Sequence, residues 1–196
     1  MAQNQRERLI AALAECLYER GFEETTISMV SKRAGVSKGD FYKHFQSKDE
    51  CFLIAYEDAV RSIYARVVEA CGEGVDWTGR VLAALDALLR HLAEEPARAR
   101  LVLVEGLRVG KGVYDRYQEA LQSFVPHLRE GAPAPAGARP PEAMDEAVVG
   151  GIASLLSRRV HDGDAERLAD FLPEVAEFAL TPYLGAVEAR RIISGL

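Results

Sequence analysis

The sequence lacks the features of a membrane-embedded or exported protein. None of its apolar runs approaches the roughly 18 residues that a transmembrane helix needs. Its first residues, from Met1 to Glu7, contain no apolar segment of the kind that a secretory signal peptide carries. We therefore expect no membrane partner and a cytoplasmic location.

Cysteine is scarce. The 196 residues include three cysteines, Cys16, Cys51 and Cys71, and no two of them have the close spacing of a CxxC metal or redox motif. An odd number without a signal peptide fits a reducing compartment. We interpret all three as free thiols packed within helices. A redox-responsive regulator that uses Cys51 or Cys71 is the alternative.

The motifs of common enzyme classes are also missing. The sequence has no HExxH, no Gly-rich phosphate loop and no GxSxG. The segment His161-Asp162-Gly163-Asp164 contains metal-binding residue types, but it reads more simply as a turn that ends a helix. We predict a protein that is not an enzyme and that holds no metal or cofactor.

Helical patterns fill most of the chain. The composition, 48% hydrophobic and 28% charged, is ordinary for a globular protein. Apolar residues recur at steps of three and four, and no convincing strand or repeat interrupts them. These patterns predict an all-α protein, with a proline-rich connecting loop over 131–141. The expected helices cover 5–19, 26–34, 37–45, 47–70, 77–93, 96–107, a segment ending near 129, 142–160, and a region over 164–184 that Pro173 and Pro182 bound or divide.

Residues 26–45 have the pattern of a helix-turn-helix. A short helix with an apolar inner face is followed by a turn at Gly35, a residue type that tolerates a left-handed backbone. The next helix buries Phe41 and Phe45, which lie one turn apart. Two short helices joined in this way pack at a steep angle, so the second can enter the major groove of DNA.

Capping residues mark the starts of two successive helices. Ser37 and Asp40 have capping-box spacing, and so do Ser47 and Glu50. Asp40 can instead accept a hydrogen bond from a cytosine amino group. We favour the capping role, because a carboxylate near phosphates costs Coulomb energy.

The charge pattern also indicates a nucleic-acid surface. The whole chain has a net charge of −6, but the segment from Thr25 to Lys48 contains five basic residues and one acidic residue, a net charge of +4. A local basic patch is sufficient for phosphate contact.

The polar residues of this segment are the candidate DNA contacts. Gly39 lets the backbone approach DNA closely, and Lys43 can reach a guanine edge or a phosphate. Thr26, Ser37 and Lys48 suit phosphate contacts, which position a protein without reading sequence. The predicted DNA-binding residues are Thr26, Ser37, Lys38, Gly39, Tyr42, Lys43, His44 and Lys48. The alternative is a helical interaction module with solvated lysines and no DNA partner.

Four segments in combination resemble the N-terminal signature of TetR-type (TetR/AcrR) regulators. They are Gly21-Phe22, Thr25-Thr26-Ile27, the run from Ala34 to Phe45, and Ser47-Lys48. The resemblance covers about residues 5–50; the remainder is similar only in helical layout and length. It departs at Asp40, where a threonine is common in the family.

This resemblance implies nine or ten helices arranged in two domains. Residues 1–47 would form a three-helix DNA-binding domain, and residues 48–196 a helical ligand-binding and dimerisation domain. It further implies a homodimeric repressor that binds an inverted-repeat double-stranded operator and leaves it when a small-molecule effector binds.

The C-terminal helices supply a candidate dimer interface. Apolar residues form a stripe on the helix expected over 142–160, and Gly150-Gly151 would permit close approach of a partner helix. Together with the following region, this helix would form a four-helix interface across a two-fold axis. An ordinary intrachain core is the alternative. The predicted interface residues are Val149, Gly151, Ile152, Leu156, Val175 and Phe178.

A ligand pocket is expected between the helices of the middle section. Each candidate residue also has a plainer interpretation, as a core aromatic, a satisfied histidine or a solvated arginine. The predicted ligand-binding residues are Tyr56, Tyr64, Trp77, His91, Arg108, Tyr114, Tyr117 and Phe124. An aromatic-lined cavity would favour a hydrophobic effector.

Overall fold

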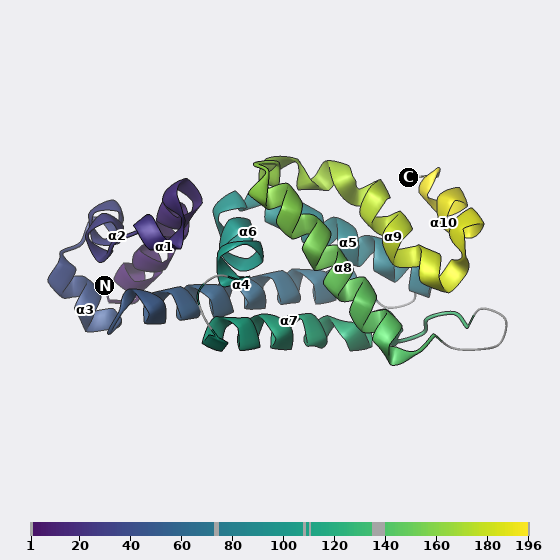
Figure 1. Cartoon of the computed structure of the whole chain (residues 1–196), viewed down its shortest axis with the longest axis horizontal. Helices are drawn as coiled ribbons and strands as arrows, with labels where there is room; N and C mark the ends of the chain where they lie inside the picture. Colours follow the sequence, from purple (N-terminus) through teal and green to yellow (C-terminus); the bar gives the residue numbers. More distant parts are fainter. Residues whose placement is uncertain (1, 73–74, 108, 110, 135–139, 196) are drawn as a thin grey trace.

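The computed structural model describes residues 2–72, 75–107, 109, 111–134 and 140–195. Within these ranges all regular structure is helical, with ten α-helices, two 3₁₀ segments and no strand. The all-α prediction is confirmed, and so is an N-terminal helix-turn-helix (Figure 1).

Three helices form a cluster at one end of the elongated molecule (Figure 1). The first helix carries Leu9, Leu13 and Leu17 on one face, and all three are fully buried. Its regular winding is broken at Gly21, whose φ of 76° is left-handed, and the helix extends to Glu24, beyond the expected end near residue 19. The three helices are α1 (Ala2–Glu24), α2 (Ile27–Ala34) and α3 (Lys38–His44).

The long helix α4 (Lys48–Ala70) leaves this cluster and runs along the length of the molecule (Figure 1). Near its start, Phe52 packs edge-on against Phe22, with ring centroids 5.3 Å apart. The apolar core therefore continues from the N-terminal helices into the remainder of the chain. That remainder comprises α5 (Trp77–Glu94), α6 (Pro96–Leu103), a 3₁₀ turn η1 (Glu105–Leu107), α7 (Lys111–Arg129), α8 (Glu142–His161), a 3₁₀ segment η3 (Ala165–Phe171), α9 (Leu172–Leu184) and α10 (Ala186–Ile193).

Two features of the C-terminal region differ from the sequence-based expectation. Pro182 lies inside α9 and does not end it. Proline has no amide to donate within the helix, and α9 ends two residues later, at Leu184. Gly185 (φ 79°) separates α9 from α10, a helix that the sequence patterns did not predict. Its Ala189 is fully buried, although most of its other side chains are exposed.

No helix in the described ranges is long and apolar enough to cross a membrane.

Candidate nucleic-acid interface and ligand pocket

The backbone of the helix-turn-helix is fixed by its capping residues. The Thr26 side chain accepts a hydrogen bond from the Met29 amide at the start of α2. Gly35 ends α2 with a left-handed φ of 65°, and its amide donates to the carbonyls of Lys32 and Ser31. The turn therefore needs a residue that adopts positive φ without strain, which explains the glycine.

A complete capping box starts α3, so the predicted role of Asp40 as a cap is confirmed. The Ser37 hydroxyl accepts from the Asp40 amide at 3.0 Å, and the Ser37 amide donates to the Asp40 carboxylate at 3.2 Å. Lys43 also donates to this carboxylate at 2.7 Å. These bonds, the Lys43 bond first and the Ser37 bonds next, lower the pKa of Asp40 to about 2.

Packing of two phenylalanines decides which face of α3 is presented to solvent. Phe41 and Phe45 are both 1% exposed, and their ring centroids are 5.4 Å apart. Tyr42, next to Phe41, is 58% exposed. Helix α3 is therefore anchored by its apolar side and presents its polar side outward.

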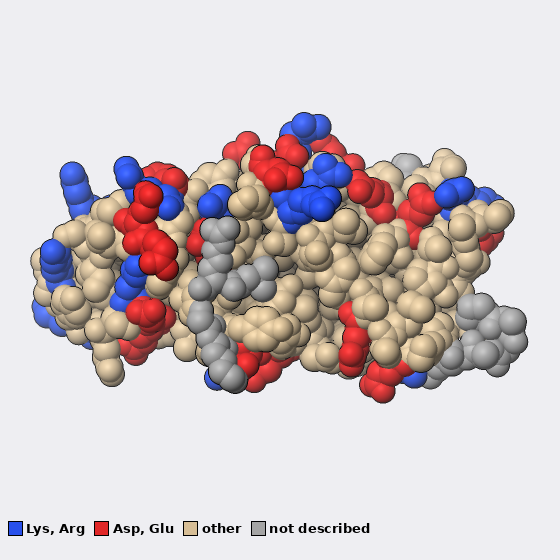
Figure 2. Space-filling view, in the orientation of Figure 1, with Lys and Arg blue, Asp and Glu red and all other residues tan. Residues whose placement is uncertain are grey.

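Most of the predicted DNA contacts share this outward surface, and Figure 2 shows lysine and arginine side chains at this end of the molecule. His44 and Lys48 are half-buried. The exposed members are Thr26, Ser37, Lys38, Gly39, Tyr42 and Lys43.

Gly39 has no internal reason to lack a side chain. Its φ is not left-handed, and a Cβ built on it would meet only the Ser37 hydroxyl, at an ordinary 3.6 Å. The fold of the single chain therefore does not require glycine at this position, and its predicted contact with DNA remains a prediction.

Besides Lys43, which is paired with Asp40, two more basic residues in the segment bind groups of the protein itself. The Lys48 ammonium donates to the carbonyls of Phe22 and Thr25, at 2.7 and 2.9 Å, and lies 3.9 Å from the centre of the Phe22 ring. Arg33 is paired with Glu19 at 2.6 Å. Lys48 therefore fastens the start of α4 to the turn between α1 and α2, a role that the sequence did not reveal; its phosphate contact remains a prediction.

A buried carboxylate also binds the backbone at Phe22. Glu105, in η1, is 1% exposed, and it accepts a hydrogen bond from the Phe22 amide at 3.1 Å. Arg100 of α6 lies 3.2 Å from the same carboxylate. We call Glu105, Arg100, Phe22 and Lys48 the interdomain clasp. The sequence analysis missed Glu105, because the pairing joins residues 83 positions apart.

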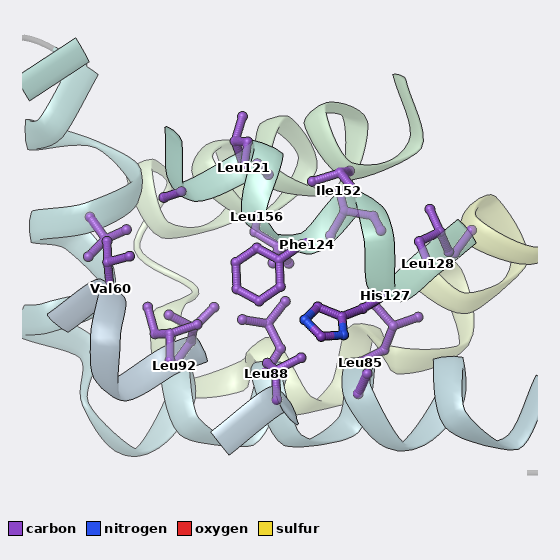
Figure 3. A pocket seen from close by; sticks show the side chains of 18 of the residues that line it. Val60, Leu85, Leu88, Leu92, Leu121, Phe124, His127, Leu128, Ile152 and Leu156 are labelled. Carbon is purple, nitrogen blue, oxygen red and sulfur yellow. The ribbon is translucent and has the colours of Figure 1, made fainter. Parts of the chain in front are cut away.

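An apolar cavity of about 160 Å³ lies among helices α4 to α9. Figure 3 shows Phe124 at its centre, with Val60 and Leu92 toward one end and His127 and Leu128 toward the other. Helix α4 lines it from Tyr56 to Cys71, a span of about 22 Å at the rise of an α-helix. The cavity is therefore elongated along α4.

Polar side chains of the cavity wall are few and lie toward its ends. Tyr56 and Tyr117 belong to the end nearer α3, while Arg80, Cys71 and His127 belong to the opposite end. Arg80 donates to the Glu130 carbonyl at 2.6 Å. Between these ends the wall is made of aliphatic side chains and Phe124.

The predicted ligand-binding residues divide into two groups. Tyr56, Tyr117 and Phe124 line the cavity, whereas Arg108 lies outside the described residues. The remaining four are not among the residues that line the cavity, and each of them has a packing or hydrogen-bond partner within the chain. Trp77 packs on Tyr183 and donates to the Leu128 carbonyl. His91 forms a hydrogen bond with Ser62, and Tyr64 forms one with His127. Tyr114 is 48% exposed and packs beside Tyr117.

The predicted dimer residues also divide. Val149, Ile152 and Leu156 line the cavity, but only Leu156 and Val175 are buried, at 2% exposed each, while Val149 and Ile152 are half-buried. Gly151 admits Phe178 of the same chain, since a Cβ there would lie 2.5 Å from the Phe178 ring. Phe178 itself is 40% exposed. Gly151 therefore makes room for Phe178 of the same chain, whereas an added Cβ at Gly150 would meet nothing within 4 Å. The close approach of a partner helix at this pair remains a prediction.

The cysteines show no sign of activation. Cys16 and Cys51 are buried, and burial raises the pKa of Cys51 to about 12. Burial also raises the pKa of Cys71. The structure therefore gives no support to a redox-responsive role.

The residues after α8 form the predicted turn. Gly163 has a left-handed φ of 94°, and the Asp164 amide donates to the Arg159 carbonyl. No cluster of three metal-binding side chains is present among the described residues.

Comparison with known proteins identifies what the N-terminal segment is similar to. The family profile described as "Bacterial regulatory proteins, tetR family" matches residues 9–54. TtgW of Pseudomonas putida, an uncharacterized HTH-type transcriptional regulator, is 24% identical over 128 residues, which are 65% of this chain and 94% of TtgW. Several other curated transcriptional regulators are matched over only 18% to 60% of their own length.

Solved structures share the fold along nearly the whole chain. The fatty acid degradation regulator FadR from Bacillus halodurans has a TM-score of 0.78 at 16% identity, covering 90% of this chain and 94% of FadR. FadR from Bacillus subtilis, solved in complex with stearoyl-CoA, has a TM-score of 0.74 at 16% identity, covering 91% and 98%. At these identities the likeness concerns the fold.

Proposed function

The chain belongs to the tetR family of bacterial regulatory proteins, and from this premise we propose that it is a homodimeric repressor that releases its operator when an apolar effector binds. The observation that carries the proposal is the anchored helix α3, whose buried phenylalanines present Lys38, Gly39 and Lys43 outward. We assign DNA binding to residues 1–47, and ligand binding and dimerisation to residues 48–196. Such a protein acts in the cytoplasm and is not an enzyme.

In this proposal α3 enters the major groove, and α2 lies across the backbone. Lys38 and Lys43 neutralise phosphates or reach base edges, while Tyr42 extends an aromatic ring and a hydroxyl beyond the helix. The exposed Thr26 and Ser37, at the starts of α2 and α3, lie where phosphate oxygens are stabilised by helix N-termini.

Dimerisation would use the exposed side of α8 and α9. Met144 and Phe178 are 37% and 40% exposed, and Ala147 between them along this side is also exposed. Figure 2 shows few charged side chains over the middle of α8. An apolar patch of this kind is what a two-fold pair of helices covers in a helical dimer.

The effector would occupy the apolar cavity. FadR from Bacillus subtilis has been solved with stearoyl-CoA, and the elongated aliphatic wall of the present cavity suits a ligand with a long hydrocarbon portion. The cavity of about 160 Å³ is too small for a large ligand of that type unless its walls separate. An effector that binds the separated state better shifts the population toward it, and α4 and the interdomain clasp carry the change to α3.

Selection of bound sequences from random duplex DNA tests the proposal directly. The expected product is an inverted repeat, because a two-fold dimer presents two identical α3 helices. The affinity should fall steeply with salt concentration, and Lys43→Ala should reduce the slope of that dependence by about 1 for each protomer, or about 2 for the dimer. A helical interaction module without DNA predicts no enrichment and no salt-dependent binding, and that result would refute the proposal.

A further inference from the structure

One polar atom of the cavity wall has no partner. The Tyr56 hydroxyl is buried and makes no hydrogen bond to the described residues, and Tyr56 as a whole is 1% exposed. Among these residues the only other buried side-chain oxygen or nitrogen without a partner is the Ser31 hydroxyl, which is not part of the cavity. Buried hydroxyls are normally paired, so an unpaired one in a ligand cavity calls for a specific explanation.

The ring of Tyr56 is held firmly in place. It stacks on Phe52, with centroids 6.4 Å apart and planes 20° from parallel. On another side it lies against Gly106, where an added Cβ would be only 2.7 Å from its Cε2 atom. The hydroxyl is therefore presented by a fixed ring and cannot easily turn toward a partner elsewhere in the protein.

An ordered water is a poor substitute for a ligand at this hydroxyl. A buried water needs two to four polar partners. Val60, one turn along α4 from Tyr56, and almost all of the remaining wall are apolar. Burial raises the pKa of Tyr56, so the phenol keeps its proton and can donate it in a hydrogen bond.

We propose that Tyr56 is the residue that reads the polarity of the effector, and that the effector is an elongated, mostly hydrocarbon molecule carrying a carbonyl oxygen at its end nearest the DNA-binding helices. The phenol O–H donates to this oxygen, and the apolar wall receives the rest. The inference rests on the proposed use of the cavity as the effector site. It adds the acceptor group and the residue that recognises it.

The position of Tyr56 also connects ligand recognition to the interdomain clasp. Gly106, which touches the Tyr56 ring, is the neighbour in sequence of Glu105. A ligand that pulls on the Tyr56 hydroxyl therefore acts one residue from the carboxylate that holds the Phe22 amide.

Two probes with the same carbon skeleton isolate the proposed hydrogen bond: butyrophenone, which has the carbonyl oxygen, and butylbenzene, which lacks it. Their dissociation constants for the full chain are measured by isothermal titration calorimetry. Tyr56→Phe removes only the hydroxyl. We expect it to weaken butyrophenone binding about three- to tenfold, as the loss of one neutral hydrogen bond does, and to leave butylbenzene binding within about twofold.

Tyr117→Phe is the matched control, because it removes a hydroxyl from a residue of the same cavity wall that is only half-buried. It should retain the wild-type ratio of the two affinities. Equal effects of Tyr56→Phe on both probes, a ratio lost in Tyr117→Phe instead, or no binding of either probe to the wild type would each overturn the proposal. Operator binding without any probe is measured separately, so a failure of the proposed DNA function is distinguished from a failure of this inference.

Discussion

At the scale of the residue, Gly39 is a position where the fold does not require glycine but the proposed complex with DNA does. A side chain at this position meets nothing but the Ser37 hydroxyl at 3.6 Å. Nothing in the isolated chain therefore requires glycine, and glycine is unfavourable within a helix.

Gly39→Ala should consequently stabilise the protein while weakening its complex. We expect the free energy of unfolding to rise by up to about 1 kcal/mol in chemical denaturation, and the affinity for the selected operator to fall at least about tenfold in a fluorescence anisotropy titration. Gly112→Ala is the control, since an added Cβ there also meets nothing within 4 Å but lies in α7. An unchanged operator affinity for Gly39→Ala would show that the DNA backbone does not approach this position.

Asp40 illustrates a different residue-scale effect, because its charge stabilises α3 from within. Asp40→Thr should lower the stability of the protein without changing the operator sequence recovered by selection. The pKa of Asp40 falls from 3.8 to about 2 on folding, so its contribution is present above pH 3.8 and is lost as the pH falls toward 2.

The stability difference between wild type and Asp40→Thr should therefore shrink over that acidic range in urea unfolding curves. A pH-independent difference would mean that the ion pair with Lys43 and the cap at Ser37 do not account for it. A changed operator sequence would mean instead that Asp40 reads bases.

At the scale of the element, the interdomain clasp joins the end of α1 to two elements that follow the helix-turn-helix. Glu105 comes from η1 and Lys48 from α4, and both bind at Phe22. The end of α1 is therefore held by η1 and by α4, the second of which also lines the cavity.

Glu105→Ala leaves the Phe22 amide unpaired and deprives Arg100 of its buried partner. We expect the free energy of unfolding to fall by about 2–4 kcal/mol, and the remaining folded protein to bind operator with little response to butyrophenone. Glu105→Gln keeps an acceptor for the Phe22 amide and should show a smaller loss of stability. Full effector sensitivity in a well-folded Glu105→Ala protein would remove the clasp from the allosteric path.

The helices and their contacts show which parts of the structure could be predicted from the sequence. Local signals such as the Ser37–Asp40 box, Gly35, and the paired Phe41 and Phe45 act over a few residues, and they predicted the helix-turn-helix correctly. The apolar stripe on α8 did not by itself distinguish a cavity wall from an interface, and the structure shows that Ile152 and Leu156 of this stripe line the cavity. Contacts such as Phe22 with Glu105 depend on packing between distant segments, and no local pattern reports them.

At the scale of the whole molecule, the exposed apolar side of α8 and α9 should determine the oligomeric state. Phe178→Asp places a charge in this surface, and the expected result is a monomer by light scattering at micromolar concentration, with weak operator binding. Val187→Asp is the control, because Val187 is 86% exposed on α10, outside the proposed interface.

Phe178 also covers Gly151, so its loss can disturb the fold as well. Met144→Asp, at a residue 37% exposed on α8, tests the same surface independently. A wild-type protein that is monomeric at micromolar concentration would refute the dimer, as would Met144→Asp and Phe178→Asp proteins that both remain dimeric.

The uneven distribution of charge has a kinetic consequence. The segment from Thr25 to Lys48 carries +4 in a chain of −6, so the other residues together carry −10. A molecule with this polarity is oriented by the field of DNA before contact, with α3 leading and the acidic body turned away. Collisions in the wrong orientation are repelled rather than trapped, which shortens the search for an operator. Because salt screens this orientation beyond about 10 Å at 0.1 M, the association rate should respond to ionic strength even where the final contacts do not.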